Sequence, residues 1–174
     1  MSILNKLDIN LTKKINNLIS KNSILLRPLI YITNTSDGRA YIFYTFLIPL
    51  IAPIYGVQIL KLGIPAYIFQ LLVYLIVKNK IKRGRPSREQ GIIPQIPPPD
   101  KYSFPSGHCA SATLLVLVLY TFNLWLTPLL VPWMLIIYFS RIALGLHYLS
   151  DVVGGVLLGF TSFFVGRYIS AYLI

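Results

Sequence analysis

Long apolar runs separated by short polar segments dominate the chain. Five runs are nearly free of charge: residues 40–60, 63–77, 111–126, 129–146 and 152–174. A helix needs about 20 residues to cross a hydrocarbon core of about 30 Å. We therefore predict an all-α integral membrane bundle of about five spanning helices. The expected spans are Tyr41 to Val57, Gly63 to Val77, Ser106 to Asn123, Pro128 to Ser140, and His147 to the C-terminus, with a turn at 62–65.

The first 36 residues follow another pattern. Between residues 4 and 20, leucines and isoleucines recur with helical spacing among lysines, which predicts an amphipathic helix lying in the membrane interface. Residues 23–35 are apolar but too short to be assigned as a span. We therefore divide the single domain, residues 1–174, into interfacial N-terminal helices (1–36) and a transmembrane core (37–174).

Between the second and third spans the pattern breaks. Residues 78–105 are rich in Lys and Arg at the start and contain prolines at 94 and 97–99, so they predict an extramembrane loop. If the second span ends at Lys78, the third starts on the same face, the fourth returns there near Arg141, and the fifth leaves from His147. Polar residues at all these points therefore converge on one face.

Composition narrows the class of partner. Hydrophobic residues make up 55% and charged residues 12% of the 174 residues, and the net charge is +11. Because the cations fall between apolar spans, they favour lipid headgroups or a phosphorylated substrate over nucleic acid. The single Cys109 excludes an intrachain disulfide, and with two histidines and five acids the chain offers little for a metal site. We expect no metal and no cofactor.

His147 and Asp151 are the first candidates for chemistry. They lie four residues apart, so on a helix they would share one face. A carboxylate that binds one ring nitrogen fixes the tautomer and leaves the other nitrogen free as a nucleophile. The alternative is a helix-capping Asp beside an interfacial His.

Three cations are candidates for binding a transferring phosphoryl group: Lys78, Arg85 and Arg141. The alternative to phosphate binding is that these cations snorkel to the membrane surface or set the topology of the chain. For the neighbouring cations, the alternative and phosphate binding explain the sequence equally well: Lys80, Lys82, Arg83 and Arg88. Arg141 differs because it follows the nearly apolar run from Trp133 to Ser140. An arginine at the membrane edge is a functional candidate.

Ser106, Gly107 and His108 stand at an expected helix start. There a hydroxyl and backbone N–H groups meet the helix dipole, which favours anions, and Gly107 permits close approach of the backbone to a phosphate. His108 is then a candidate general acid for a leaving alcohol. The alternative is an interfacial histidine whose hydrogen bonds are satisfied.

These residues form three ordered motifs: Lys78-x6-Arg85-Pro86, Pro105-Ser106-Gly107-His108 and Ser140-Arg141-x5-His147-x3-Asp151. The motifs resemble the signatures of the type-2 phosphatidic acid phosphatase superfamily, which also includes vanadium haloperoxidases and bacterial acid phosphatases. The resemblance covers residues 78–151, and the flanking spans fit its membrane branch, whose members commonly have six spans.

The resemblance implies a metal-independent lipid phosphatase that works through a phosphohistidine. By analogy His147 attacks phosphorus, Asp151 orients it and His108 protonates the leaving group. The phosphate ligands would be Lys78, Arg85, Ser106, Gly107 and Arg141. Expected substrates are lipid A 1-phosphate, undecaprenyl diphosphate or phosphatidylglycerophosphate, in a bacterial inner membrane with the site facing the periplasm or outside. Orientation rests on analogy, because cations needed for function obscure the positive-inside rule.

Two other functions stay open at this point. A vanadate-dependent haloperoxidase would use the same pocket and would oxidise halide when vanadate is added, although five membrane spans argue against it. A non-enzymatic protein that binds or transports anionic lipid would release no phosphate, and it would tolerate replacement of His147.

Overall fold

The computed structural model describes residues 3–172, and within these residues the regular elements are helices, with no strand. The helices are α1 (Ile3–Ser20), α2 (Ser23–Asn34), α3 (Gly38–Ile51), α4 (Gly56–Ile81), α5 (Gly107–Thr121), α6 (Thr127–Ala143) and α7 (Leu149–Tyr172), with a short 3-10 turn at Arg88–Gln90. The predicted all-α fold is confirmed. Residues 1, 2, 173 and 174 of the expected domain lie outside the described residues, as does the end of the last expected span.

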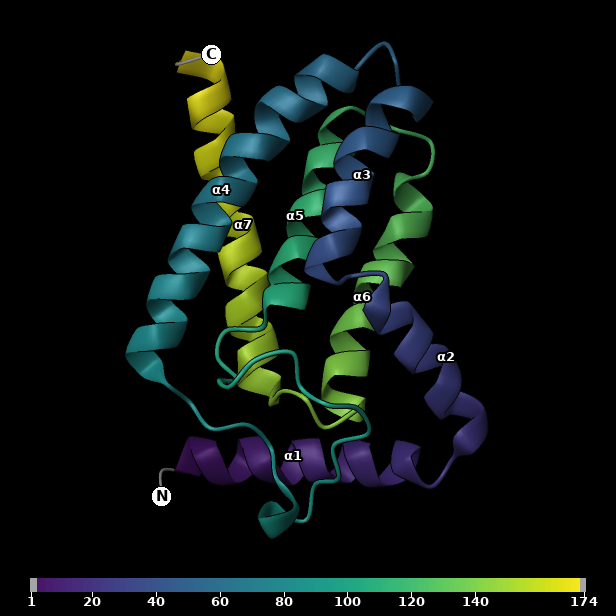
Figure 1. The fold of residues 1–174 in the computed structure, drawn as a ribbon, viewed down its shortest axis with the longest axis vertical. Coiled ribbons are helices and arrows are strands. Elements are labelled where there is room, and N and C mark those ends of the chain that lie inside the picture. Colours follow the sequence, from purple (N-terminus) through teal and green to yellow (C-terminus); the bar gives the residue numbers. More distant parts are fainter. Residues whose placement is uncertain (1–2, 173–174) are drawn as a thin grey trace.

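Five helices, α3 to α7, run along the length of the molecule, and α1 lies across one end of them (Figure 1). The long connection from α4 to α5 crosses α1, makes its short 3-10 turn beyond α1, and returns to the bundle at the start of α5 (Figure 1). The start of α5, the end of α6 and the start of α7 all lie at this end, which we call the α1 end. The opposite end carries the end of α7 and the α3–α4 connection (Figure 1).

The predicted turn at 62–65 is wrong. Helix α4 continues through it with Pro65 inside the helix, and the turn lies instead at residues 53–55. The residue before a proline avoids helical angles, and Ala52, which precedes Pro53, has φ −131° and ψ 62°. The first expected span therefore ends at Ile51 rather than Val57, and the second begins at Gly56. Proline inside an apolar helix is tolerated in membrane proteins.

Two helices in the described part of the chain are long and apolar enough to cross a membrane: α4 with 26 residues and α7 with 24. The remaining bundle helices are apolar but shorter, with 14 residues in α3, 15 in α5 and 17 in α6. The five-span count therefore stays a prediction. The outward faces still carry large apolar side chains, including Phe46, Leu50, Leu129 and Phe164, each more than 60% exposed. Exposed apolar area on this scale marks a surface that lipid or a partner covers.

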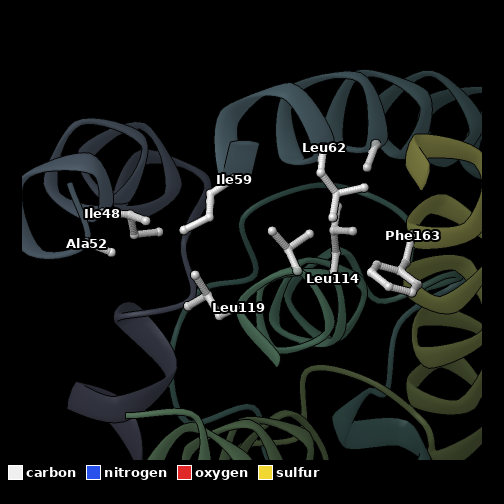
Figure 2. Close-up of a cluster of buried hydrophobic side chains, with 9 residues drawn as sticks. Ile48, Ala52, Ile59, Leu62, Leu114, Leu119 and Phe163 are labelled. Atoms are coloured by element: carbon white, nitrogen blue, oxygen red, sulfur yellow. The ribbon is translucent and has the colours of Figure 1, made fainter. Parts of the chain in front are cut away.

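The apolar core joins α3, α4, α5 and α7, and Figure 2 shows its side chains meeting between these helices. Small residues of α7 let the helices approach. A Cβ added at Gly166 would lie 2.4 Å from Ala66 Cβ on α4, and one at Gly155 would lie 2.4 Å from the carbonyl oxygen of Ser106. Such small-residue contacts are typical of membrane helix packing. Here they set the start of α7 directly against the start of α5.

Helix α1 is amphipathic as predicted, and the face it turns toward the protein combines a polar stripe with Ile19, which is buried against Leu29 and Ala143. Asp8, Thr12 and Asn16 are buried, whereas Leu7 and Leu18 are 53% and 72% exposed. Asn16 binds two distant segments, because its amide donates to the carbonyls of Ile93 and Ala143. The polar stripe therefore docks on the α1 end of the bundle, and the leucines face outward.

Candidate active site

The structure brings the sequence-predicted residues together at the α1 end. Lys78 lies in the last turn of α4, Ser106 is the N-cap of α5, and Gly107 and His108 begin that helix. Arg141 lies in the last turn of α6 and Asp151 in the first turn of α7. Arg85 and His147 lie in the connecting loops.

His147 lies in a tight loop rather than on a helix, contrary to the shared helix face that we predicted. The N–H groups of Leu146 and His147 both donate to the carbonyl of Arg141 at 3.1 Å, and Gly145 adopts φ +68°, which favours glycine. Helix α7 begins only at Leu149. The loop still sets His147 Nδ1 at 3.6 Å from Asp151 Oδ2.

That 3.6 Å contact is longer than a hydrogen bond, and Nδ1 has no hydrogen-bond partner within the described residues. Asp151 Oδ2 instead accepts the N–H of Tyr148 at 2.9 Å. Contacts between a base and its orienting group are often loose without substrate and tighten with it. The geometry therefore suits an Asp that holds one ring nitrogen and leaves Nε2 facing the cations.

The imidazole of His147 is 2% exposed and surrounded by positive charge. Its Nε2 lies 3.4 Å from Arg85 Nη1. Burial holds the pKa of His147 well below its usual range, and the charges of Arg141, Arg85 and Lys78 lower it further. A neutral imidazole at physiological pH follows, which is the form a nucleophile needs.

Lys78 and Arg85 share a carboxylate that the sequence motifs did not indicate. Asp100 accepts Lys78 Nζ at 2.7 Å and Arg85 Nη2 at 2.8 Å, and its backbone oxygen accepts Arg85 Nε at 2.8 Å. Burial raises the pKa of Asp100, but the bonds and charges of the two cations outweigh burial and lower this pKa to about 2. Asp100 is thus an ionised counter-ion within the cluster.

Arg141 is the most deeply buried cation. Its side chain is 1% exposed, and Nη1 donates to Thr33 Oγ1 of α2 at 2.9 Å. Among the described residues, Nε and Nη2 have no hydrogen-bond partner. Buried guanidinium donors without partners are costly, so they favour an anionic ligand at this point.

The α5 residues are placed differently from each other. The Ser106 hydroxyl donates to Cys109 Sγ at 3.2 Å, and its N–H donates to the carbonyl of Asp151 at 3.0 Å. Gly107 has little room for a side chain, since a Cβ would lie 3.0 Å from the Tyr74 ring. His108 Nε2 lies 3.7 Å from Asp37 Oδ1, with Arg141, His147 and Arg85 in electrostatic range.

Sequence reasoning missed Asp100 and misjudged Arg83. We assigned Arg83 equally to a topology signal, but its guanidinium bridges two carboxylates, at 2.6 Å from Asp151 Oδ1 and 2.6 Å from Asp8 Oδ2. Neither residue falls in a motif, and their partners lie far away in the chain. The R-x-R-P run from Arg83 to Pro86 was the one local signal available.

Chemically, the cluster can offer basic donors to a tetrahedral oxyanion beside a neutral imidazole. Between residues 3 and 172, no group of three or more His, Cys, Asp or Glu side chains lies close enough to hold a metal ion. The charges of Lys78, Arg85 and Arg141 all act on His147.

A family model described as the PAP2 superfamily matches residues 60–174, which include every candidate motif. The chain belongs to the PAP2 superfamily. The predicted family resemblance is thereby confirmed.

Individual relatives are lipid phosphatases by name. Decaprenylphosphoryl-5-phosphoribose phosphatase of Mycobacterium tuberculosis is 39% identical over 90 residues, which cover 51% of this chain and 49% of the relative. Sphingosine-1-phosphate phosphatase 1 of Rattus norvegicus is 32% identical over 126 residues, covering 67% of this chain and 28% of the relative. This PAP2 chain spans about half the length, or less, of these curated relatives.

Two crystal structures share the fold. LpxE of Aquifex aeolicus aligns with TM-score 0.78 and 22% identity, over 93% of this chain and 95% of that chain. The transmembrane PAP2-type phosphatidylglycerolphosphate phosphatase of Bacillus subtilis aligns with TM-score 0.79 and 20% identity, over 100% and 89%. The helical arrangement, with α1 and α2 included, is therefore that of membrane PAP2 proteins.

Removing the Asp100 charge should strengthen anion binding. In Asp100→Asn a negative charge that competes for Lys78 and Arg85 is lost, so we expect the Kd for inorganic phosphate to fall about tenfold. Isothermal titration of the detergent-solubilised protein measures this value. Glu89→Gln removes an exposed carboxylate of the same loop and should change Kd less than about twofold. A Kd that rises in Asp100→Asn would instead make Asp100 the anchor that holds the two cations in place.

Proposed function

We propose that this PAP2 protein is an integral membrane, metal-independent phosphatase that hydrolyses lipid phosphates. The observation that carries the proposal is the buried Arg141 guanidinium, with unpaired donors, in the same cluster as the neutral His147. A purely structural arginine would be expected to have its donors satisfied. A cluster that binds a phosphoryl group needs these donors until the charged group arrives.

The proposed reaction has two steps. Burial and nearby cations lower the pKa of His108 in the free protein, and the bound phosphate, being anionic, offsets them so that His108 takes up a proton. His147 Nε2 attacks phosphorus while the bond between phosphorus and the lipid oxygen breaks, and the protonated His108 gives its proton to that oxygen. Asp151 holds Nδ1–H and stabilises the charge that forms on the ring. Water then attacks the phosphohistidine, its proton passes to His108, and inorganic phosphate leaves. Lys78, Arg85, Arg141 and the start of α5 at Ser106 and Gly107 would stabilise the phosphoryl oxygens.

Support for a lipid substrate comes from apolar surfaces. A cavity of about 350 Å³ lies between α3, α4 and α5, and its lining includes Tyr41, Ile59, Tyr67, Leu114 and Val118. An apolar lining suits hydrocarbon rather than a soluble phosphate ester. The outward apolar faces of α3, α6 and α7 fit a bilayer setting.

We place the protein in a bacterial cytoplasmic membrane with the α1 end facing the outside. The two proteins that share the fold come from Aquifex aeolicus and Bacillus subtilis, and the second is named as a transmembrane phosphatase. The orientation is taken by analogy with bacterial relatives of the superfamily, in which the site faces the periplasm. The basic residues at the α1 end serve the site in this orientation and do not act as a topology signal.

The nucleophile is tested by replacing His147. In His147→Ala the attacking nitrogen is gone, so phosphate release from lipid phosphates should fall about 10³-fold or more. Release by the purified protein is measured across a panel of lipid phosphates, in excess EDTA, where the wild type should stay active. Unchanged thermal unfolding of the variant serves as the control. Substantial release by His147→Ala, or loss of wild-type activity in EDTA that divalent ions restore, contradicts the proposal.

We infer a preference among substrate headgroups from the exposed cations around the site. We call these cations the basic rim: Lys13, Lys14, Lys80, Lys82, Arg88 and Lys101. Arg83, which we had expected in this group, is held by Asp8 and Asp151 and does not contribute. The rim exceeds what one phosphate needs, so we propose that lipid A 1-phosphate and undecaprenyl diphosphate are preferred over phosphatidic acid.

Charge reversal tests this preference. In Lys80→Glu/Lys82→Glu, the KM for lipids with more than one negative phosphate should rise about tenfold, and the KM for phosphatidic acid less than threefold. Initial rates in mixed micelles at fixed ionic strength provide the measurement. Equal changes for all lipids would show that the rim binds bulk anionic lipid and does not select the headgroup.

A further inference from the structure

Arg83 links helix α1 to the start of helix α7 at the candidate active site. Its Nη1 lies 2.6 Å from Asp151 Oδ1, and its Nη2 lies 2.6 Å from Asp8 Oδ2 on α1. The guanidinium also stacks 4.2 Å above the Tyr148 ring. Ser150 completes the cluster, because its N–H donates to Asp8 Oδ1 at 3.1 Å and its hydroxyl contacts Asp8 Oδ2.

The partners of Arg83 are buried. Asp8 is 7% exposed, Asp151 is 0% exposed, and the Arg83 side chain is 20% exposed. Buried carboxylates need paired charge, and removing one partner of such a pair is costly. The nearby docking of Asn16 on Ile93 and Ala143 holds the same face of α1 in place. Asp8 is therefore presented to Arg83 by a helix that is attached at a second point.

This arrangement leaves each oxygen of Asp151 with a different partner. Oδ1 binds Arg83, whereas Oδ2 accepts the Tyr148 N–H at 2.9 Å and faces His147 Nδ1 at 3.6 Å. The rotation of the carboxylate is thus set by Arg83 on one side. Arg83 also donates to two uncharged acceptors, from Nη2 to Asn5 Oδ1 at 3.3 Å and from Nη1 to Ser150 Oγ at 2.5 Å. Without the charge of Asp8, the planar fork of Arg83 could still turn and take both oxygens of Asp151. His147 would then lose its orienting group.

We propose that Asp8, acting through Arg83, is a positioning residue for the Asp151–His147 pair. Helix α1 is then part of the catalytic apparatus as well as a surface helix. Asp8 lies outside residues 60–174, which the PAP2 family model matches. The inference rests on the proposed function for its activity readout. Its structural readout, the state of the His147 ring, does not need the enzyme to turn over.

The test compares Asp8→Asn with the wild type in two measurements. We expect kcat to fall about tenfold or more while KM stays within about twofold, because the phosphate ligands are unchanged and the nucleophile is misoriented. We also expect a shift in the ¹⁵N resonances of His147, which report the tautomer. The chain has two histidines, so assignment needs one further spectrum, of His147→Ala.

Three variants make the result decisive. Glu89→Gln removes an exposed carboxylate at the same end and should leave kcat and the spectrum unchanged. Asp8→Glu keeps the charge and should recover part of the lost kcat. Where Asp8→Asn does not fold, Arg83→Lys replaces it, since a single ammonium cannot bridge both carboxylates in the same way, and the same changes are expected.

Wild-type kcat and an unchanged His147 spectrum in Asp8→Asn would overturn the positioning role. So would a fall in kcat that merely follows the loss of folded protein, with His147 in its native tautomer. If the wild type releases no phosphate from any lipid phosphate, the proposed function fails, and the ¹⁵N spectrum alone still decides whether Asp8 orients the His147 ring.

Discussion

Burial of positive charge at one end of a helix bundle is the constraint on which the rest of the site depends. Lys78, Arg85 and Arg141 are all nearly inaccessible to water, where an unpaired cation is expensive. The chain has five acidic residues, and Asp8, Asp37, Asp100 and Asp151 all lie against a cation or a histidine of this cluster. Four of the five acidic residues of the chain therefore lie at the candidate site.

The cations of the site are not equally compensated by carboxylates, and this difference bears on the chemistry. Asp100 compensates Lys78 and Arg85, and Asp8 with Asp151 compensates Arg83. Arg141 has the Thr33 hydroxyl as its hydrogen-bond partner and no carboxylate among the ion pairs of the described residues. The uncompensated charge lies next to the histidine that we propose as nucleophile. An anionic phosphoryl group would meet the strongest unpaired donors where bond formation takes place.

The sequence predicted the helices and the motif residues because both are local signals. Apolar runs indicate helices that face lipid or the core. The spacing between Lys78 and Arg85, and between Arg141 and His147, is visible directly in the sequence. Pro65 was misread because proline ends helices in water but is tolerated in apolar helices.

Contacts between distant segments could not be predicted in this way. Asp8 and Arg83 are 75 residues apart, and the Asp8 carboxylate contacts Ser150 across 142 residues. The helical period showed that α1 is amphipathic, but a polar stripe looks the same whether it faces water or a buried arginine. The role of Asp100 could not be predicted from the sequence either, because it depends on how the proline-rich loop folds back onto α4.

The most direct test of the central claim is to trap the intermediate. The purified protein is mixed rapidly with a ³²P-labelled lipid phosphate, quenched in alkali, which preserves phosphohistidine, and digested for mass spectrometry. We predict label on the peptide that contains His147, bound to the imidazole, appearing before free phosphate and absent from His147→Ala. Label on another residue would contradict the claim. So would phosphate release at the wild-type rate with no labelled protein at any time, because water would then attack the lipid phosphate directly.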